Sequence, residues 1–153
     1  MDLTTHSLPQ FVVDASIAVK WHLRDEQDAE TAIQVLTDYR DGRVSLVAPE
    51  QIRYEVPSAI RNAVRTRRMT ADAGAMAVAD FLSWNIPTVT DNALTLNGYR
   101  LVIRFGCSFY DGLYVALAER ANASLVHAGN RLRNAIGGTF PLEMWMDDYR
   151  ILG

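Results

Sequence analysis

The sequence predicts an α/β fold, in which a central, mostly parallel β-sheet is flanked by helices on both faces. Short apolar runs such as Phe11–Val13 and Val44–Ala48 have the length and composition of strands that are buried on both faces. Between them lie segments in which apolar residues recur every three or four positions, as on one face of a helix. Strands that alternate with helices form a parallel sheet covered on both sides. Because sites in such sheets form at the carboxyl ends of the strands, Asp14 and the loop after His127 are the first places to look for chemistry.

The first half of the chain predicts three helices around these two strands. One follows Asp14, and a second runs from Asp28 until Asp41–Gly42 stops it. Pro49 suits the first turn of a third, long helix. Pro57 falls in the middle of that helix, where it removes a hydrogen bond and should kink or split the helix.

In the second half, capping residues mark where helices begin. Thr70 is a candidate N-cap for a helix that Pro87 closes, and Ser108 with Asp111 three residues later has the pattern of a capping box. The remaining segments are a helix from about Asn92 to Phe105, a strand from Ser124 to His127, and a tail from Phe140 to Leu152 without a clean period.

Composition limits the class of protein. The 153 residues are enough for one domain, which we place at residues 1–153 with a short disordered segment at about 1–9. A formal net charge of −3 argues against binding nucleic acid through global positive charge, although not against nucleic acid as a substrate. The single cysteine, Cys107, suits a reducing compartment. No apolar run approaches the roughly 18 residues of a membrane span. We therefore expect a cytoplasmic protein with no membrane partner.

Three acidic residues form the candidate site. Asp14 ends the first strand, Glu55 lies on the helix after the second, and Asp111 lies in the first turn of a later helix. If the sheet brings them together, their charges call for a compensating cation, and a hard divalent metal such as Mg²⁺ or Mn²⁺ takes oxygen ligands. Metal-assisted attack of water on a phosphodiester is the expected chemistry. Each residue also has an ordinary alternative: Asp14 as an N-cap, Asp111 as part of a capping box, and Glu55 as a solvated helix residue.

Four blocks of sequence resemble one known family, the PIN-domain ribonucleases, and within it the VapC-type toxins of toxin–antitoxin pairs. Each block is weakly specific alone, but the ordered set spans nearly the whole chain. The blocks are FVVDASIAVKWHL at residues 11–23, APEQIRYEVPSAI at 48–60, SFYDGLYVALAE at 108–119 and SLVHAGNRLRNAI at 124–136.

The resemblance implies a PIN-like fold and a metal-dependent endoribonuclease that cleaves RNA. It implies Asp14 and Asp111 as metal ligands, with Glu55 holding a metal-bound water or helping to activate the nucleophile. Ser16, two residues after the first aspartate, is implied as a supporting residue near the metal, with Mg²⁺ or Mn²⁺ as the cofactor.

The same resemblance implies two protein partners. One is a cognate VapB-type antitoxin, whose C-terminal segment occupies a groove beside the acidic residues, and the other is a second copy of the chain in a homodimer. Apolar residues without an obvious core period are candidates for these surfaces, with core packing as the ordinary alternative. They are Trp84, Met144, Trp145 and Met146.

The fourth block departs from the family pattern. Where the family usually presents another aspartate, this chain has Gly129, followed by Asn130, which offers only a neutral amide oxygen. Gly129 could also simply mark a tight turn. An alternative hypothesis is therefore a catalytically weakened PIN-fold module that binds RNA or antitoxin without efficient cleavage.

A receiver domain that accepts a phosphoryl group is a further α/β alternative with acidic residues at strand ends. It needs an acidic pair after the first strand and a lysine near the last. Asp14 stands alone at its strand end, and the chain's one lysine is Lys20. The sequence therefore disfavours this alternative.

Basic residues gather on the helix that carries Glu55. Arg61, Arg65 and Arg68 are spaced by four and three positions, so they share one helix face. A solvated face is the ordinary interpretation. Beside a metal site, however, such a stripe can position a phosphate backbone, so Arg61 and Arg65 are the candidate RNA-binding residues.

Overall fold

The computed structural model describes residues 7–26 and 28–150, and the chain there forms a five-stranded sheet with every neighbouring pair parallel. The strand order is β3-β2-β1-β4-β5, so β1 lies at the centre. The predicted α/β class is confirmed. The strands are β1 (Gln10–Val13), β2 (Ser45–Pro49), β3 (Thr88–Val89), β4 (Ser124–His127) and β5 (Glu143–Trp145).

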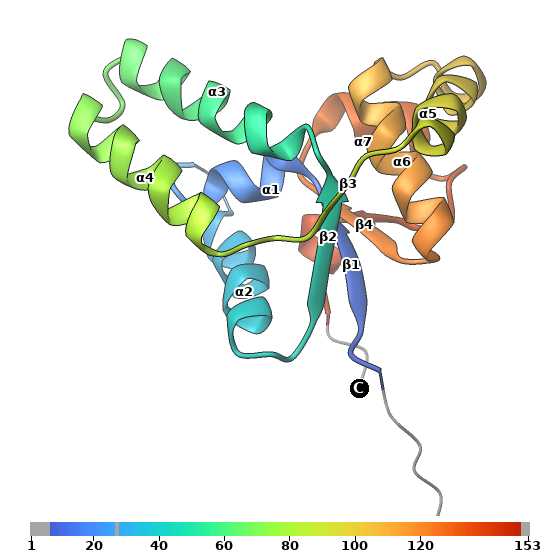
Figure 1. The fold of residues 1–153 in the computed structure, drawn as a ribbon, viewed down its shortest axis with the longest axis horizontal. Helices are drawn as coiled ribbons and strands as arrows, with labels where there is room; N and C mark the ends of the chain where they lie inside the picture. The colour runs from blue at the N-terminus through green and yellow to red at the C-terminus, as the bar shows by residue number, and fades with distance from the viewer. Residues whose placement is uncertain (1–6, 27, 151–153) are drawn as a thin grey trace, which may run out of the picture.

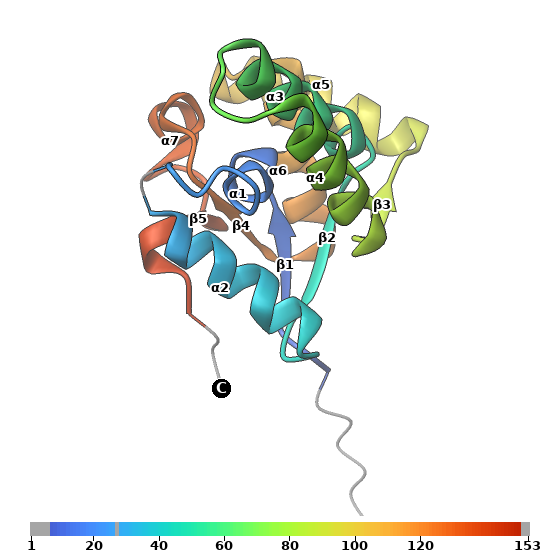
Figure 2. The same ribbon diagram turned by 90° about the vertical axis from the view of Figure 1, so that its left-hand side faces the viewer.

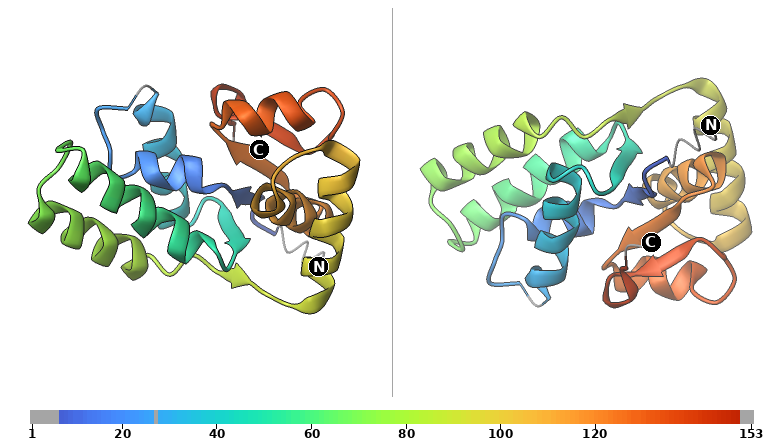
Figure 3. Two further views of the ribbon diagram at one scale, coloured as in Figure 1. Left: turned by 90° about the horizontal axis from the view of Figure 1, so that it is seen from above. Right: turned by 90° about the horizontal axis from the view of Figure 1, so that it is seen from below.

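Helices cover both faces of the sheet. In Figure 1, α1 and α2 lie on one side of the central strands, and α5 and α6 lie on the other. The view from the side shows α2 running beside β1, and the view from above shows α3 and α4 projecting together as a helical hairpin (Figures 2 and 3). The helices are α1 (Ala15–Lys20), α2 (Ala29–Arg40), α3 (Ile52–Arg65), α4 (Ala71–Ser83), α5 (Asn92–Phe105), α6 (Phe109–Ala121) and α7 (Asn130–Ile136), with a final 3₁₀ turn at Met146–Asp148.

The helix starts predicted from capping residues are confirmed. The Thr70 hydroxyl accepts a hydrogen bond from the Ala73 N–H at 3.1 Å, and the Ser108 hydroxyl accepts one from the Asp111 N–H at the same distance. Each hydroxyl satisfies a backbone donor that the helix itself leaves unpaired. The sequence pattern was therefore sufficient to place the starts of α4 and α6.

The prediction that Pro49 begins a helix is wrong, because Pro49 is the last residue of β2. It pairs with Val89 of β3, but the backbone N–H groups of Ala48 and Glu50 donate the hydrogen bonds on that side. The ladder with β1 ends at Val47, so neither neighbouring strand needs the N–H that proline lacks. Pro57 does not split its helix, because α3 continues from Ile52 through to Arg65.

Glycines make a close helix–helix contact where α5 crosses α6. A Cβ placed on Gly112 would lie 2.7 Å from the carbonyl oxygen of Gly98, and one on Gly98 would lie 2.8 Å from Leu113 Cδ2. Only residues without a side chain allow these backbones to come so near. The contact fixes the first turn of α6, which carries Asp111.

The two ends of the chain test the domain prediction only in part. Residues 1–6 of the predicted disordered segment lie outside the described residues, whereas the Pro9 carbonyl already accepts a hydrogen bond from the Ser45 N–H at 2.9 Å. A single domain over residues 1–153 stays a prediction. Within the described residues no single helix is long and apolar enough to cross a membrane, and α5 with α6 meets that test only as a pair bent by 110°.

Candidate functional site

The strand order places the candidate site where the chain changes direction across the sheet. From β1 the chain moves outward to β2 and β3, and then returns to add β4 and β5 on the other side of β1. The loops after β1 and β4 therefore diverge, and a crevice forms at such a point in open α/β sheets. Asp14 follows β1 and Gly129 lies in the loop after β4, so both predicted positions are at the carboxyl ends of the central strands.

Asp14 is buried, with 8% of its surface exposed, and Ser16 holds its carboxylate. The Ser16 N–H donates to Asp14 Oδ2 at 3.0 Å, and the Ser16 hydroxyl donates to the same oxygen. Asp14 is thus the N-cap of α1 as well as a candidate site residue. Burial raises its pKa above the usual range, and repulsion from Asp111 acts in the same direction, while the Ser16 hydrogen bonds oppose both.

Ser16 also joins the two central strand ends. Its hydroxyl oxygen accepts a hydrogen bond from the Ala128 N–H at 2.9 Å, while its hydrogen goes to Asp14. The loop after β4 is therefore held to the loop after β1 by one side chain. The role this supports for Ser16 is to orient Asp14.

Glu55 lies in the first turn of α3 and is half-buried. Burial is the main cause that raises its pKa to about 7, and the charges of Asp14 and Asp111 raise it further. The Tyr114 hydroxyl donates to Glu55 Oε1 at 3.1 Å and partly offsets this effect. Glu55 is thus not an ordinary solvated helix residue.

Tyr114 is a site residue that the sequence reasoning missed. It is fully buried on α6, three residues after Asp111, so both side chains lie on the same helix face. The spacing was the available signal, but the pattern of α6 alone cannot show that the hydroxyl contacts a glutamate 59 positions earlier.

Asp111 is half-buried in the first turn of α6, where its backbone is held by Ser108. Its charge contributes to the raised pKa of both Asp14 and Glu55, which places the three carboxylates in one electrostatic environment. We call Asp14, Glu55 and Asp111 the acid site. The structure brings these three predicted residues to the same end of the sheet.

The chemistry of the acid site fits a hard divalent cation. Carboxylates that raise one another's pKa are stabilised by a positive ion among them, and Mg²⁺ is bound by one or two carboxylates together with water. In the described part of the chain, no three His, Cys, Asp or Glu side chains lie close enough together to hold a metal ion by themselves. Mg²⁺ needs only one or two carboxylate ligands from the protein, and Asp14 and Asp111 are two such carboxylates.

Gly129 caps α7 without a side chain. Its φ of −92° and ψ of 116° are open to any residue, so the tight-turn interpretation is wrong. A Cβ there would meet Leu132 Cβ at 3.9 Å, which is an ordinary contact. The backbone can thus accept an aspartate at this position. Asn130 is the first residue of α7 and is exposed.

The buried histidine near the site, His127, has a structural role. His127 Nε2 lies 2.8 Å from Glu143 Oε1, and the Gly129 N–H donates to Nδ1 at 3.3 Å. Because Nδ1 accepts this hydrogen bond, the ring hydrogen is on Nε2, and Nε2 donates a hydrogen bond to the Glu143 carboxylate. His127 joins β4 to β5 through this bond.

The arginine stripe is not one uniform surface. Arg68 makes ion pairs with Asp25 and Glu26, so its charge is already compensated. Arg61 and Arg65 are exposed, and Arg65 donates a hydrogen bond to Asn62 Oδ1 at 2.7 Å. Arg53, in the first turn of α3, is also exposed but lies 3.9 Å from Glu50 Oε1. Among the described residues, Arg61 and Arg65 are therefore the exposed arginines of α3 without an ion pair.

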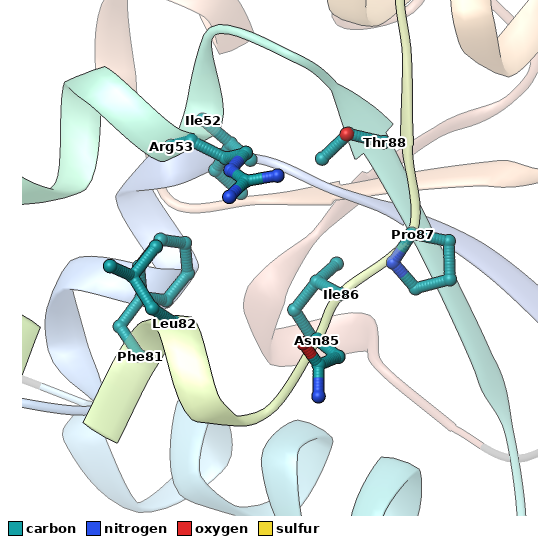
Figure 4. Close-up of a pocket in the computed structure, with 8 residues that line it drawn as sticks. All are labelled: Ile52, Arg53, Phe81, Leu82, Asn85, Ile86, Pro87 and Thr88. Carbon is teal, nitrogen blue, oxygen red and sulfur yellow. The ribbon is translucent and has the colours of Figure 1, made fainter. Parts of the chain in front are cut away.

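Two grooves adjoin the acid site. The first, which we call the tyrosine groove, has a volume of about 660 Å³ and includes Glu55 and Arg61 in its walls. The second, of about 310 Å³, includes Asp111 and Arg131. A third pocket, of about 230 Å³, contains no acid-site residue and lies between the start of α3 and the segment after α4, where Arg53 extends toward Thr88 (Figure 4).

The apolar residues considered for partner surfaces lie mostly in the core. Met146 is buried, and Met144 is partly buried against the core. Trp84 stacks on His22 with ring centroids 5.4 Å apart, and Trp145 packs against His127. Core packing is therefore the better interpretation of these side chains.

Comparisons with known proteins agree with this architecture. The family model described as "PIN domain" matches residues 11–137. Ribonuclease VapC12 of Mycobacterium tuberculosis is 30% identical over 138 residues, which cover 87% of this chain and 97% of that protein.

Two solved structures share the fold. PAE2754 from Pyrobaculum aerophilum has a TM-score of 0.65 and 19% identity, covering 92% of this chain and 93% of its own. VapC20 of Mycobacterium tuberculosis, described as a Sarcin-Ricin loop cleaving toxin, has a TM-score of 0.60 and 16% identity, covering 82% and 95%. The chain belongs to the PIN-domain family.

Proposed function

We propose that this protein is a metal-dependent endoribonuclease, the toxin of a VapBC-type toxin–antitoxin pair, with Mg²⁺ or Mn²⁺ as its cofactor. The observation that carries the proposal is the acid site, in which burial and mutual repulsion raise the pKa of both Asp14 and Glu55 at the switch point of a PIN-domain sheet. Similarity to Ribonuclease VapC12 supports RNA as the substrate.

Each acidic residue has a distinct role in the proposed reaction. Asp14, oriented by Ser16, and Asp111, positioned by the first turn of α6, would hold the cation. A bound divalent ion would supply positive charge for the phosphate oxygens and for activation of water. Glu55 receives the proton of the attacking water as the general base. Tyr114 keeps the Glu55 carboxylate in place through Oε1.

The test is cleavage of RNA by the purified, antitoxin-free protein. With Mg²⁺ or Mn²⁺ the wild type should cut, whereas addition of EDTA or the change Asp14→Asn should abolish cutting. Asn is nearly the same shape as Asp, so Asp14→Asn removes charge and leaves the cap of α1 largely intact. Cutting that survives both EDTA and Asp14→Asn would sink the proposed mechanism.

The second candidate function is a PIN-fold module that binds RNA or antitoxin but cuts poorly. Gly129 favours it, because the position has room for a carboxylate and carries none. Gly129→Asp adds both a charge and an N-cap for α7, so Gly129→Asn is the matched control that adds only the cap. A strong gain of cutting with Asp and none with Asn would support the weakened module. High activity of the wild type would discard it.

The partners and location are part of the same proposal. A VapB-type antitoxin and a homodimer are supported by the similarity to VapC12, and a cytoplasmic location by the RNA substrate. For the homodimer, the place to test is the outer face of α5, where three apolar side chains spaced like one helix face are exposed. They are Leu96, Tyr99 and Ile103.

A further inference from the structure

The tyrosine groove contains aromatic side chains that have no role in the proposed reaction at the carboxylates. It lies between α3 and the start of α6, and its wall includes Glu55 but neither of the proposed metal ligands. The lining residues are Gln51, Tyr54, Glu55, Ser58, Ala59, Arg61, Asn62 and Tyr110. The groove therefore continues the acid site along the surface.

Two tyrosines of the groove are strongly exposed. Tyr54 has 69% of its surface accessible and Tyr110 has 61%. Single exposed apolar residues are common on proteins, but here two rings from different helices line one groove. Their place is fixed by a contact between the two elements, because Gln51 Nε2 donates to the Tyr110 carbonyl oxygen at 2.9 Å. The Phe109 ring packs beside Tyr110 at 5.9 Å.

The position of both rings in the sequence relates them directly to the acid site. Tyr54 immediately precedes Glu55 on α3, and Tyr110 immediately precedes Asp111 on α6. Consecutive helix residues point in different directions, so the rings face the groove and not the acid site, and Glu55 is the carboxylate that the two share. A substrate with a phosphate at the carboxylates must have its neighbouring groups within reach of the groove.

Exposed tyrosine rings select a substrate with accessible flat faces. Unpaired nucleobases stack on aromatic side chains, whereas bases inside a duplex already stack on one another. Arg61, in the same groove, supplies a positive charge for the backbone phosphate. Amide groups of Gln51 and Asn62 add donors and acceptors for base edges.

We propose that Tyr54 and Tyr110 form a subsite on which an unpaired nucleotide next to the scissile phosphate stacks. This inference rests on the proposed ribonuclease function. It adds that these two rings select unpaired bases and that Arg61 positions the backbone phosphate.

The test measures stacking separately from cutting. The Asp14→Asn protein with Mg²⁺ is titrated into a short RNA that carries 2-aminopurine, whose fluorescence falls when it stacks. The RNA is used as a single strand and annealed to its complement. We expect fluorescence to fall for the single strand but not for the duplex. Tyr54→Leu and Tyr110→Leu keep apolar bulk without an aromatic ring and should each weaken binding roughly 5- to 100-fold, while Tyr54→Phe and Tyr110→Phe should bind as before.

A matched control and the cleavage assay keep the two hypotheses apart. Met76 on α4 is 68% exposed and lies outside the groove, so Met76→Ala should change nothing. If the wild type cuts RNA and the Leu variants bind and cut as well as it does, the stacking subsite is refuted and the ribonuclease function stands. If the Leu variants lose only binding of an antitoxin, the groove is a protein site and the inference is overturned. If the wild type does not cut RNA at all, the proposed function itself fails.

Discussion

The raised pKa of Glu55 predicts how the metal-free protein responds to pH. The ordinary pKa of a glutamate is 4.5, and burial together with Asp14 and Asp111 raises that of Glu55 to about 7. The folded state thus prefers the protonated form. The resulting stabilisation is fully present below pH 4.5 and is lost as the pH rises through 7. The change Glu55→Gln should remove this pH dependence, because glutamine keeps the shape and can still accept from Tyr114 without titrating.

The magnitude follows from the difference between the two pKa values. About 2.5 pH units at roughly 1.36 kcal/mol each set an upper limit near 3.4 kcal/mol. Because Glu55 is only half-buried, solvent screening reduces this to about 1–2 kcal/mol. For a chain of this size that corresponds to roughly 2–8 °C in Tm. Glu55→Gln should therefore melt above the wild type by that amount at pH 8, and the gap should narrow as the pH falls from 7 toward 4.5.

The assay is thermal unfolding of both proteins in EDTA at pH 5, 6, 7 and 8. Other groups titrate in both proteins alike, so the difference between the two curves isolates Glu55. Glu30→Gln, on the exposed face of α2, is the control and should follow the wild-type curve at every pH. A gap between Glu55→Gln and wild type that is the same at pH 5 and pH 8 would refute the reasoning.

Three further changes test other parts of the structure. Tyr149→Phe removes the hydrogen bond from the Tyr149 hydroxyl to buried Asp38 Oδ2, 2.8 Å away, and urea unfolding should show a loss of about 1–3 kcal/mol; a loss below about 0.5 kcal/mol would contradict it. Gly112→Ala forces a Cβ against the Gly98 carbonyl and should lower the free energy of unfolding by about 1–3 kcal/mol, unlike a neutral surface change. Leu96→Glu places a charge on the exposed face of α5 and should shift a homodimer to monomer in light scattering, whereas Met76→Glu on α4 should not; a dimer that persists would move the interface elsewhere.

Patterns within one element predicted most of the fold. The apolar run at Phe11–Val13, the cap at Ser108 and the period from Asn92 to Phe105 each depend on neighbouring residues, and the structure has all three. The two shortest strands were not predicted, because the two residues of β3 and the three of β5 contain too few positions to show a period. Pro49 was misplaced because its tolerance in β2 depends on where the ladder with β1 ends.

The sequence was enough to name the carboxylates of the candidate site but not to predict their contacts. Asp14 and Asp111 could be named from strand-end and helix-start positions, and the strand order then brought them to one edge. Tyr114 could not be named, because its role depends on how α6 packs against α3 across the sheet end. The exposure of Tyr54 agrees with its place off the buried face of α3, but its position in one groove with Tyr110 depends on the tertiary structure.

The glycine contact between α5 and α6 links the sequence of one helix to the function of another. Asp111 takes its position from a pair of residues, Gly98 and Gly112, that have no side chains to adjust. A Cβ at Gly98 meets Leu113 Cδ2, which another rotamer of that side chain can relieve, whereas a Cβ at Gly112 meets the backbone carbonyl oxygen of Gly98 and must push α5 and α6 apart. α5 contributes no carboxylate to the acid site, yet the backbone carbonyl of its Gly98 limits which residue α6 can carry next to Asp111.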